Sequence, residues 1–287
     1  MRAERRSGSL MAAPYAAFLL VFAAYPILFA LVLVFLKWDL VTTPVFAGAD
    51  NMRMLATDSR FWRAVANTFV FLSIHLPLQV ASALMLALAL NRPLAFRSFW
   101  RAAFFLPVVI SGAVVAILWS NLYATDVGLI NGVLVRIGLS PVPWLTNPST
   151  AMPAIAAMVT WKNVGFYVII YLAGLQYIPR SCKEAIEIEG ATPWQRFRYL
   201  TLPLLLPQTI LVVTLSTING FQLFIEPYVM TGGGPLRRTY SIVLYLYTNA
   251  FAYQKMGYAA TIGVALALII GSVVFIQRRV IGNAEAL

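Results

Sequence analysis

The sequence has little charge, one cysteine and one histidine. Only 11% of its 287 residues are charged, whereas a soluble domain carries about 25%. The single cysteine, Cys182, excludes an internal disulfide and a zinc site built from several cysteines. His75 has no H-E-x-x-H partner motif, so we expect it to pack between helices, and we predict no metal site.

A phosphate-binding loop of the form G-x-x-x-x-G-K-[ST] is also missing from the sequence. The nearest candidate, residues 231–235 (Thr-Gly-Gly-Gly-Pro), has no following lysine and is predicted to be a turn. We therefore do not expect this chain to hydrolyse ATP, and we assign it no catalytic residue.

Apolar residues make up 61% of the chain, too many for a soluble protein to cover with polar groups. A bilayer accepts such side chains on the outside of the protein. The net charge of +11 comes from basic residues in short groups between apolar runs, which is typical of loops beside membrane spans. We therefore expect a membrane protein and no nucleic-acid partner.

Several apolar stretches are long enough to cross a bilayer, which takes about 20 helical residues. The first is too long for a secretory signal, whose apolar part has about 7–15 residues, so we expect it to be retained. A shorter stretch, residues 240–253, is predicted to lie at the interface or along the bundle. The predicted spans are residues 11–36, 64–90, 102–125, 151–176, 207–229 and 257–277.

The distribution of arginine and lysine predicts which side of the membrane each loop occupies. An even number of spans places both termini on one side, and that side carries the denser arginine groups. We therefore predict a cytoplasmic N-terminus (1–10), a membrane domain (11–280) and a cytoplasmic tail (281–287).

The loop between the fourth and fifth spans has signals for two short helices. Ser181 followed by Glu184 forms a potential capping box at the start of the first helix. Gly190 is a natural helix stop, because glycine accepts a positive φ. A second helix is predicted to begin at Thr192, with Pro193 in its first position and a second capping box closed by Gln195.

The second helix of this loop is predicted to end at Pro203, and Pro207 to begin the fifth span. Isolated short helices are marginal in water, so the loop is more plausible if it packs against something. From the residues alone, two alternatives stay open: the loop binds a partner, or it folds back on its own bundle. The apolar side chains concerned are Ile186, Ile188, Trp194 and Phe197.

The run from Glu184 to Ala191, followed by Gln195, Phe197 and residues 202–207, resembles the cytoplasmic loop of ABC importer permeases. The match is to the carbohydrate branch, whose maltose-type and glycerol-phosphate-type subunits carry E-A-A-x-x-D-G-A-x-x-x-Q-x-F-x-x-I-x-L-P-L-L-x-P. The chain departs from it at Ile186, Glu189 and Leu200: Glu189 keeps the charge and Leu200 the size class of the usual residue, while Ile186 is larger than the usual alanine. The resemblance covers about residues 10–280, including 105–109, 128–131, 172–179 and 231–235.

The resemblance implies an all-α membrane protein of the type I ABC importer permease fold, with about six spans and a cytoplasmic coupling helix–turn–helix at residues 178–206. It also implies a multi-pass protein of the cytoplasmic (inner) membrane of a prokaryote. The implied partners are a second homologous permease, a dimer of cytoplasmic ABC ATPases, an extracytoplasmic substrate-binding protein and the lipid bilayer. ATP and magnesium would act in the ATPase, with no cofactor in this chain. The implied ATPase contacts are Glu184, Ala185, Ile186, Glu189, Gly190, Ala191, Gln195 and Phe197.

Polar groups at membrane depth usually face a cavity or a partner helix. In the fifth predicted span, Asn219, Gln222 and Glu226 have the spacing of one helical face. Together with Lys162 and Asn163 they are candidates to line a path for a sugar or related polyol. The alternatives are hydrogen bonds between helices or a Lys162–Glu226 pair. Three aromatic residues could stack on sugar rings or simply pack: Trp161, Tyr167 and Phe221.

Two other functions compete with an ATP-driven importer. A secondary transporter driven by an ion gradient needs buried acidic groups, but only Glu226 lies near the membrane interior, and the 178–206 loop would be unexplained. A membrane-embedded enzyme needs a catalytic cluster at one depth, and none appears in the sequence.

Overall fold

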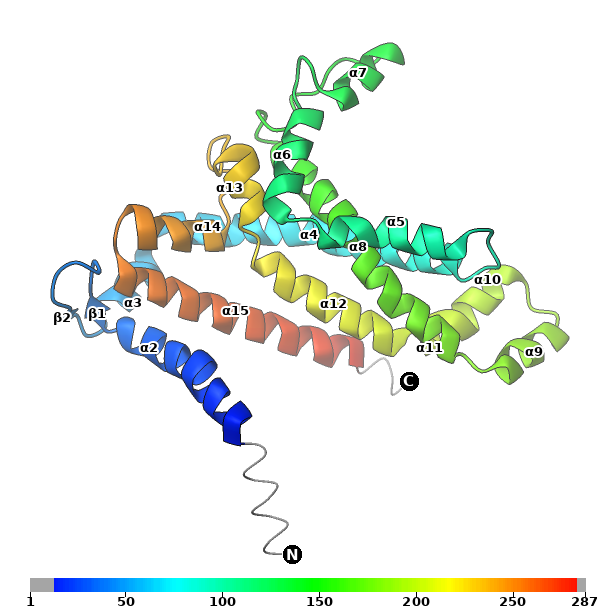
Figure 1. The fold of residues 1–287 in the computed structure, drawn as a ribbon, viewed down its shortest axis with the longest axis horizontal. Coiled ribbons are helices and arrows are strands. Elements are labelled where there is room, and N and C mark those ends of the chain that lie inside the picture. Colours follow the sequence, from blue (N-terminus) through cyan, green and yellow to red (C-terminus); the bar gives the residue numbers. More distant parts are fainter. Residues whose placement is uncertain (1–12, 283–287) are drawn as a thin grey trace, which may run out of the picture. The chain divides into compact units, whose positions relative to one another are not determined.

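The computed structural model describes residues 13–282 of the chain, most of them helical (Figure 1). The predicted N-terminus (1–10), the first two residues of the first predicted span and the end of the predicted tail (283–287) lie outside the described residues. The chain divides into two compact units, each made of two stretches. Unit 1 combines residues up to 61 with residues 245–268, and unit 2 combines residues 62–244 with those from 269 onward.

Unit 1 begins with a helix over Ala13–Leu33. This helix contains a π-helical turn, η1 (Leu20–Ala24), and continues as α2 (Tyr25–Leu33). Two short antiparallel strands follow, β1 (Leu36–Lys37) and β2 (Val45–Phe46), and then α3 (Asp50–Thr57). Asn51 holds this stretch together, because its buried side-chain amide donates to the carbonyls of Val34 and Leu36.

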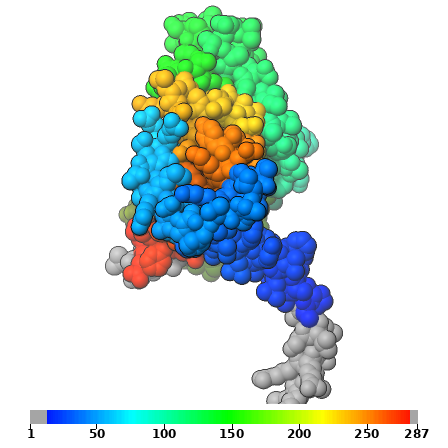
Figure 2. All heavy atoms as spheres, turned by 90° about the vertical axis from the view of Figure 1, so that its left-hand side faces the viewer, coloured from blue at the N-terminus to red at the C-terminus, as the bar shows by residue number. Residues whose placement is uncertain are grey.

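The second stretch of unit 1 holds the end of α14 (Ile242–Tyr247), the π-helical η3 (Thr248–Ala252) and the first half of α15 (Met256–Gly282). It lies directly on the first stretch, as the blue and orange atoms of Figure 2 show. The amide of Met256 donates to the carbonyl of Trp38 over 3.0 Å. A Cβ on Gly257 would lie 1.7 Å from the Leu36 carbonyl oxygen, so only glycine permits this approach.

The carboxylate of Asp58, the residue directly after α3, joins the two stretches of unit 1. Asp58 accepts hydrogen bonds from the hydroxyls of Tyr245 and Tyr258 and from the amide of Arg60. Burial alone would raise the pKa of Asp58, but these hydrogen bonds outweigh it and hold that pKa below its usual value.

Unit 2 is organised around α8 (Ala151–Tyr177), the most deeply buried long helix of the described chain. Most of α4 (Ser59–Leu90) and the whole of α5 (Arg97–Val109) lie in the same unit, with α6 (Gly112–Leu122) and α7 (Leu129–Arg136) after them. A Cβ on Gly165 of α8 would lie 2.1 Å from the Phe104 carbonyl oxygen of α5. The absence of a side chain there therefore lets the two backbones touch.

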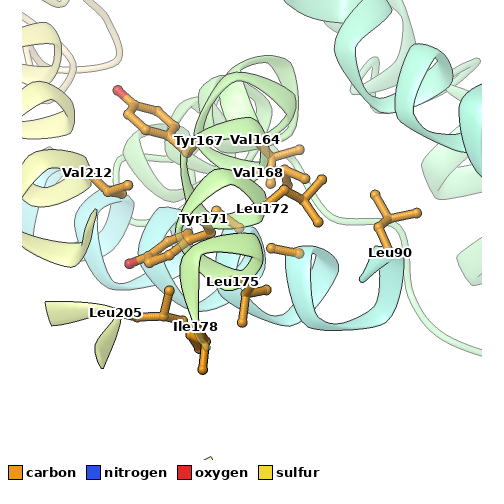
Figure 3. Packing of buried hydrophobic residues seen from close by; sticks show 12 residues of the cluster. Leu90, Val164, Tyr167, Val168, Tyr171, Leu172, Leu175, Ile178, Leu205 and Val212 are labelled. Atoms are coloured by element: carbon orange, nitrogen blue, oxygen red, sulfur yellow. The ribbon is translucent and has the colours of Figure 1, made fainter. Parts of the chain in front are cut away.

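The rest of unit 2 returns to α8 through the 178–206 loop and α12 (Leu206–Phe221), and continues as α13 (Ile225–Thr231). Figure 3 shows the apolar cluster that joins α8 to its neighbours, with Tyr171, Leu175 and Ile178 beside Leu205 and Val212. A buried polar site lies elsewhere in the unit, where the two ring nitrogens of His75 lie 2.8 Å and 3.4 Å from the hydroxyls of Thr160 and Ser216. This is the helix-packing role expected for His75.

Within residues 13–282, four helices are long and apolar enough to cross a membrane, and the number rises to six if each of two bent helix pairs counts as one span. The predicted span 102–125 is not one continuous helix, because α5 and α6 meet at 99° across the extended residues 110 and 111. The predicted span 207–229 also differs: its helix ends at Phe221. Pro227 explains this break, since a proline ring would clash with the carbonyl four residues earlier in a continued helix.

Candidate coupling loop and substrate pathway

The first helix of the 178–206 loop is α9 (Arg180–Ile188). The predicted Ser181–Glu184 capping box is wrong: the helix starts earlier, at Arg180, after the extended Pro179, and no side chain of the described residues caps it. Its end is as predicted. Gly190 has φ +72°, and the amides of Gly190 and Ala191 donate to the carbonyls of Glu187 and Ile186 over 3.0 Å and 3.2 Å. This pair of bonds is a complete Schellman motif.

The second helix of the loop is α10 (Pro193–Arg196), and its predicted capping box is confirmed. The Thr192 hydroxyl accepts from the Gln195 amide at 3.3 Å, while the Gln195 side chain accepts from the Thr192 amide at 2.7 Å. The helix does not stop at Pro203. It runs on through η2 (Phe197–Thr201) and α11 (Leu202–Leu204), and α12 then leaves at 65°.

Side chains tie the two short helices to each other. Arg196 forms an ion pair with Glu187 of α9, and its Nε donates to the Ala191 carbonyl at 3.3 Å. Within the second helix and its continuation, the rings of Trp194 and Phe197 pack with centroids 5.5 Å apart. An exposed ion pair contributes little stability, about 0–1 kcal/mol, but together with the Schellman motif and the capping box it fixes the angle between the helices.

The ends of the loop are anchored while its middle is exposed. Ile178 and Leu205 are buried in the cluster of Figure 3, so the loop leaves α8 and enters α12 at fixed points. Between them, Ile188 is 87% and Trp194 69% exposed. Glu184 is exposed and makes no ion pair with any of the described residues. A loop folded back on its own bundle would cover these apolar side chains, so that alternative does not describe this chain.

The five predicted pathway residues come from three helices. Lys162 and Asn163 lie half-buried on α8, and Asn219 and Gln222 lie exposed at the end of α12. The Asn219 amide donates to the Tyr167 hydroxyl at 3.3 Å.

Glu226 lies on a different helix, α13, so the prediction of one stripe with Asn219 and Gln222 is wrong. Its carboxylate would be 3.8 Å from a Cβ on Gly112 of α6. Among residues 13–282, Lys162 and Glu226 do not come within ion-pair distance. The structural pair considered from the sequence is therefore not formed.

The comparisons with known proteins bear on both features. The family model described as "Binding-protein-dependent transport system inner membrane component" matches residues 5–282. The chain belongs to this family. It is thus an inner-membrane permease component of an ABC importer, and the ion-gradient alternative has no support among its relatives.

Two relatives and one solved structure illustrate the likeness. The lactose transport system permease protein LacF of Rhizobium radiobacter is 37% identical over 277 residues, which cover 94% of this permease and 92% of LacF. The probable ABC transporter permease protein YesP of Bacillus subtilis (strain 168) is 34% identical over 281 residues, 96% of this permease and 90% of YesP. A chain of the bacterial alginate ABC transporter in complex with an alginate pentasaccharide-bound periplasmic protein shares the fold, with a TM-score of 0.84, 23% identity and coverage of 99% and 97%.

The aromatic candidates of the permease have different environments. Tyr167 and Phe221 are fully buried and pack within unit 2, so they cannot stack on a ligand here. Trp161 is about half exposed and packs against Trp119 with centroids 5.3 Å apart. The segment 231–235 is a turn, as predicted, with Gly232 and Gly233 at positive φ.

Proposed function

We propose that this permease forms half of the translocation pathway of an ABC importer for a sugar, oligosaccharide or related polyol. The proposal extends to the 178–206 loop, which we infer couples the pathway to a separate ATPase. The substrate class rests on the printed name of LacF, a lactose transport system permease that matches nearly the whole chain.

The observation that carries the proposal is a stiff loop with exposed apolar side chains. A partner shifts a two-state equilibrium only by the free energy it gains in one state over the other. A flexible loop would absorb the movement of the ATPase, whereas two helices fixed by the Schellman motif and the Thr192–Gln195 capping box transmit it to α8 and α12.

The partner surface follows from the exposed residues. Glu184, free of any described partner, pairs with a basic group on the ATPase, and Ala185 next to it permits close approach. Ile186 and Phe197 are half-buried, and Phe197 packs against the exposed ring of Trp194. ATP and magnesium act in that partner, and this chain needs no cofactor of its own.

The remaining subunits complete the pathway. They are a second homologous permease, a dimer of cytoplasmic ABC ATPases and an extracytoplasmic substrate-binding protein. The 178–206 loop and both termini then face the cytoplasm. The alginate transporter structure, in complex with its periplasmic protein, provides a precedent for an external receptor.

The pathway side chains are proposed as two groups. Asn219 and Gln222 present exposed amides at the end of α12, and Lys162 and Asn163 lie on α8. Glu226 contributes from α13. Amides and charges of this kind suit hydroxyl-rich ligands, because each can exchange hydrogen bonds with water for hydrogen bonds with a hydroxyl.

Vesicle uptake tests the function. The permease is co-purified with its partner subunits, reconstituted, and assayed for uptake of labelled sugars delivered by the external binding protein. We expect uptake to require ATP on the side of the membrane that the ATPase subunits face, and to be independent of ion gradients. Uptake that follows an imposed proton or sodium gradient without ATP would overturn the proposal.

A further inference from the structure

An apolar groove of about 510 Å³ lies within unit 2, between α4, α5 and α8. Its two hydroxyl groups are already satisfied within their own helices, because Ser82 donates to Leu78 and Thr160 to Ala156 over 2.6 Å and 2.7 Å. The lining is therefore mostly apolar, which suits a hydrocarbon chain better than a sugar. Its main apolar lining comes from Leu78, Leu86, Trp100, Phe104, Pro107 and Ala157.

Two arginines, Arg97 and Arg101, lie on α5 on either side of Trp100, which lines the groove. Arg97 and Arg101 are four residues apart on α5, and Phe104 follows three residues later, so all three share one side of the helix. The Nε of Arg97 donates to the Leu90 carbonyl at the end of α4. The Nε and Nη2 atoms of Arg101 are buried and have no acceptor among the described residues.

Charge around the arginines is uncompensated. No carboxylate in residues 13–282 pairs with Arg97 or Arg101. Buried guanidinium nitrogens without acceptors, such as the Nε and Nη2 of Arg101, are costly, and a phosphate suits a guanidinium because its oxygens accept two parallel hydrogen bonds from it. The geometry thus calls for an anion at the mouth of an apolar groove.

The dimensions of the groove match one leaflet of a bilayer. Leu78 and Leu86 are eight residues apart on α4, a rise of about 12 Å, and half of the hydrocarbon core is about 15 Å thick. Exposed aromatic side chains surround the arginines: Phe96 is 83% exposed, and Phe99 and Trp100 are also exposed. Aromatic and arginine side chains gather in this way where lipid headgroups meet water.

We propose that an anionic phospholipid occupies this groove, with its phosphate on Arg97 and Arg101 and an acyl chain along Leu86, Phe104 and Pro107. Arginine suits this role better than lysine, since its fork holds a phosphate in a fixed orientation. The site is independent of the transported cargo and would bind the lipid that surrounds the assembled importer.

Photolabelling of the complete importer tests the site. The complex is reconstituted in phosphatidylcholine vesicles that contain a small fraction of phosphatidylglycerol with a diazirine in mid-chain, and labelled peptides are identified by mass spectrometry. We expect the phosphatidylglycerol probe to label residues 78–107. A phosphatidylcholine probe with the same diazirine should label these residues several-fold less. Removing both charges in R97Q/R101Q should lower this preference by about fivefold for each arginine.

Matched variants separate the lipid site from general effects. R278Q/R279Q removes two arginines from the end of α15 and should leave the preference unchanged. R97K/R101K keeps the charges and should retain most of it, while A157F fills the groove and should lower labelling with both arginines in place. If R97Q/R101Q does not assemble into the importer, the labelling of R101Q alone and of A157F provides the test.

Three results would overturn the proposal. They are equal labelling by the two lipids, undiminished labelling of the charge-removal and groove-filling variants, and cross-linking of a cysteine at Ala157 to a partner subunit. The last result would show that protein, not lipid, fills the groove.

Discussion

Replacing Gly190 by valine should uncouple transport from ATP hydrolysis without preventing insertion of the permease. Gly190 has φ +72°, a backbone conformation that costs a residue with a Cβ about 1–2 kcal/mol and is especially poor for a β-branched side chain. A Cβ would meet nothing within 4 Å in the described chain, so the cost is conformational and involves no clash. The Schellman bonds to Ile186 and Glu187 depend on this conformation.

A cost of 1–2 kcal/mol corresponds to a factor of about 5–30 in the population of the docked geometry. The loop can escape the strain by giving up the Schellman bonds and rotating α9 relative to α10, because the exposed Glu187–Arg196 ion pair and the Arg196–Ala191 hydrogen bond oppose that rotation only weakly. ATP-driven uptake by vesicles with G190V should therefore fall by about that factor. The amount of inserted permease should remain normal.

Gly232 supplies a matched control for Gly190. It also has a positive φ, +59°, and a Cβ there would likewise meet no described atom within 4 Å. G232V imposes the same local cost away from the loop and should leave coupling intact, and G190N should be mild because asparagine tolerates this conformation. Normal uptake with G190V, or an equal fall with G232V, would refute the reasoning.

Three further changes test other parts of the structure. W194A should weaken co-purification of the ATPase several-fold. Thermal stability should be unchanged, because the Trp194 ring is mostly exposed. A loss of thermal stability would instead mean that the ring packs in the bundle. The pKa of Asp58 is lower in the folded state than its usual value, so its stabilising contribution is complete above about pH 5 and is lost as pH falls through the folded pKa. Melting curves between pH 3 and pH 7 should therefore show an acid loss that D58N lacks, and identical curves would contradict this. G165A should abolish folding or lower the melting temperature sharply, because its Cβ would lie 2.1 Å from a backbone oxygen, whereas G271A, with open space in the described structure, should be neutral or stabilising.

Local signals predicted the 178–206 loop well where the chemistry is local. Gly190 and the Thr192–Gln195 box depend only on neighbouring backbone groups, and both appear as expected. The start of α9 was mispredicted because the Ser181–Glu184 pattern competes with Pro179, whose extended backbone begins the helix at Arg180. A proline before a run of helix formers was the stronger signal.

The breaks in the spans could be seen only in part. Pro227 lies in the predicted fifth span, so the sequence alone could predict that a helix would break before it, because the proline ring clashes with a continued helix. The bend between α5 and α6 was not, since Pro107 lies inside α5 without ending it. Hydropathy measures the length of an apolar run and does not detect a change in its direction.

Contacts between residues that are distant along the chain could not be predicted from the sequence. The sequence marks Asp58 as an ordinary loop acid, yet Tyr245 and Tyr258, which are 187 and 200 positions away, donate hydrogen bonds to it. The apolar groove and the unpaired guanidinium of Arg101 depend on the packing of three helices. Periodicity assigns a face to each helix, but which faces meet is decided by close approaches such as that of Gly165.

How the loop acts on the bundle follows from its two anchors. Ile178 ends the run of α8 and Leu205 precedes α12, and both are buried in one cluster. A Cβ on Gly174 would lie 2.6 Å from the Gln208 side chain and 2.8 Å from that of Leu205, so α8 and α12 are in tight contact just beyond the loop. Close-packed interiors transmit displacement instead of absorbing it. A force on the exposed face of the loop must therefore move α8 and α12 together, and these two helices carry Lys162, Asn163 and Asn219, the side chains proposed to meet the substrate.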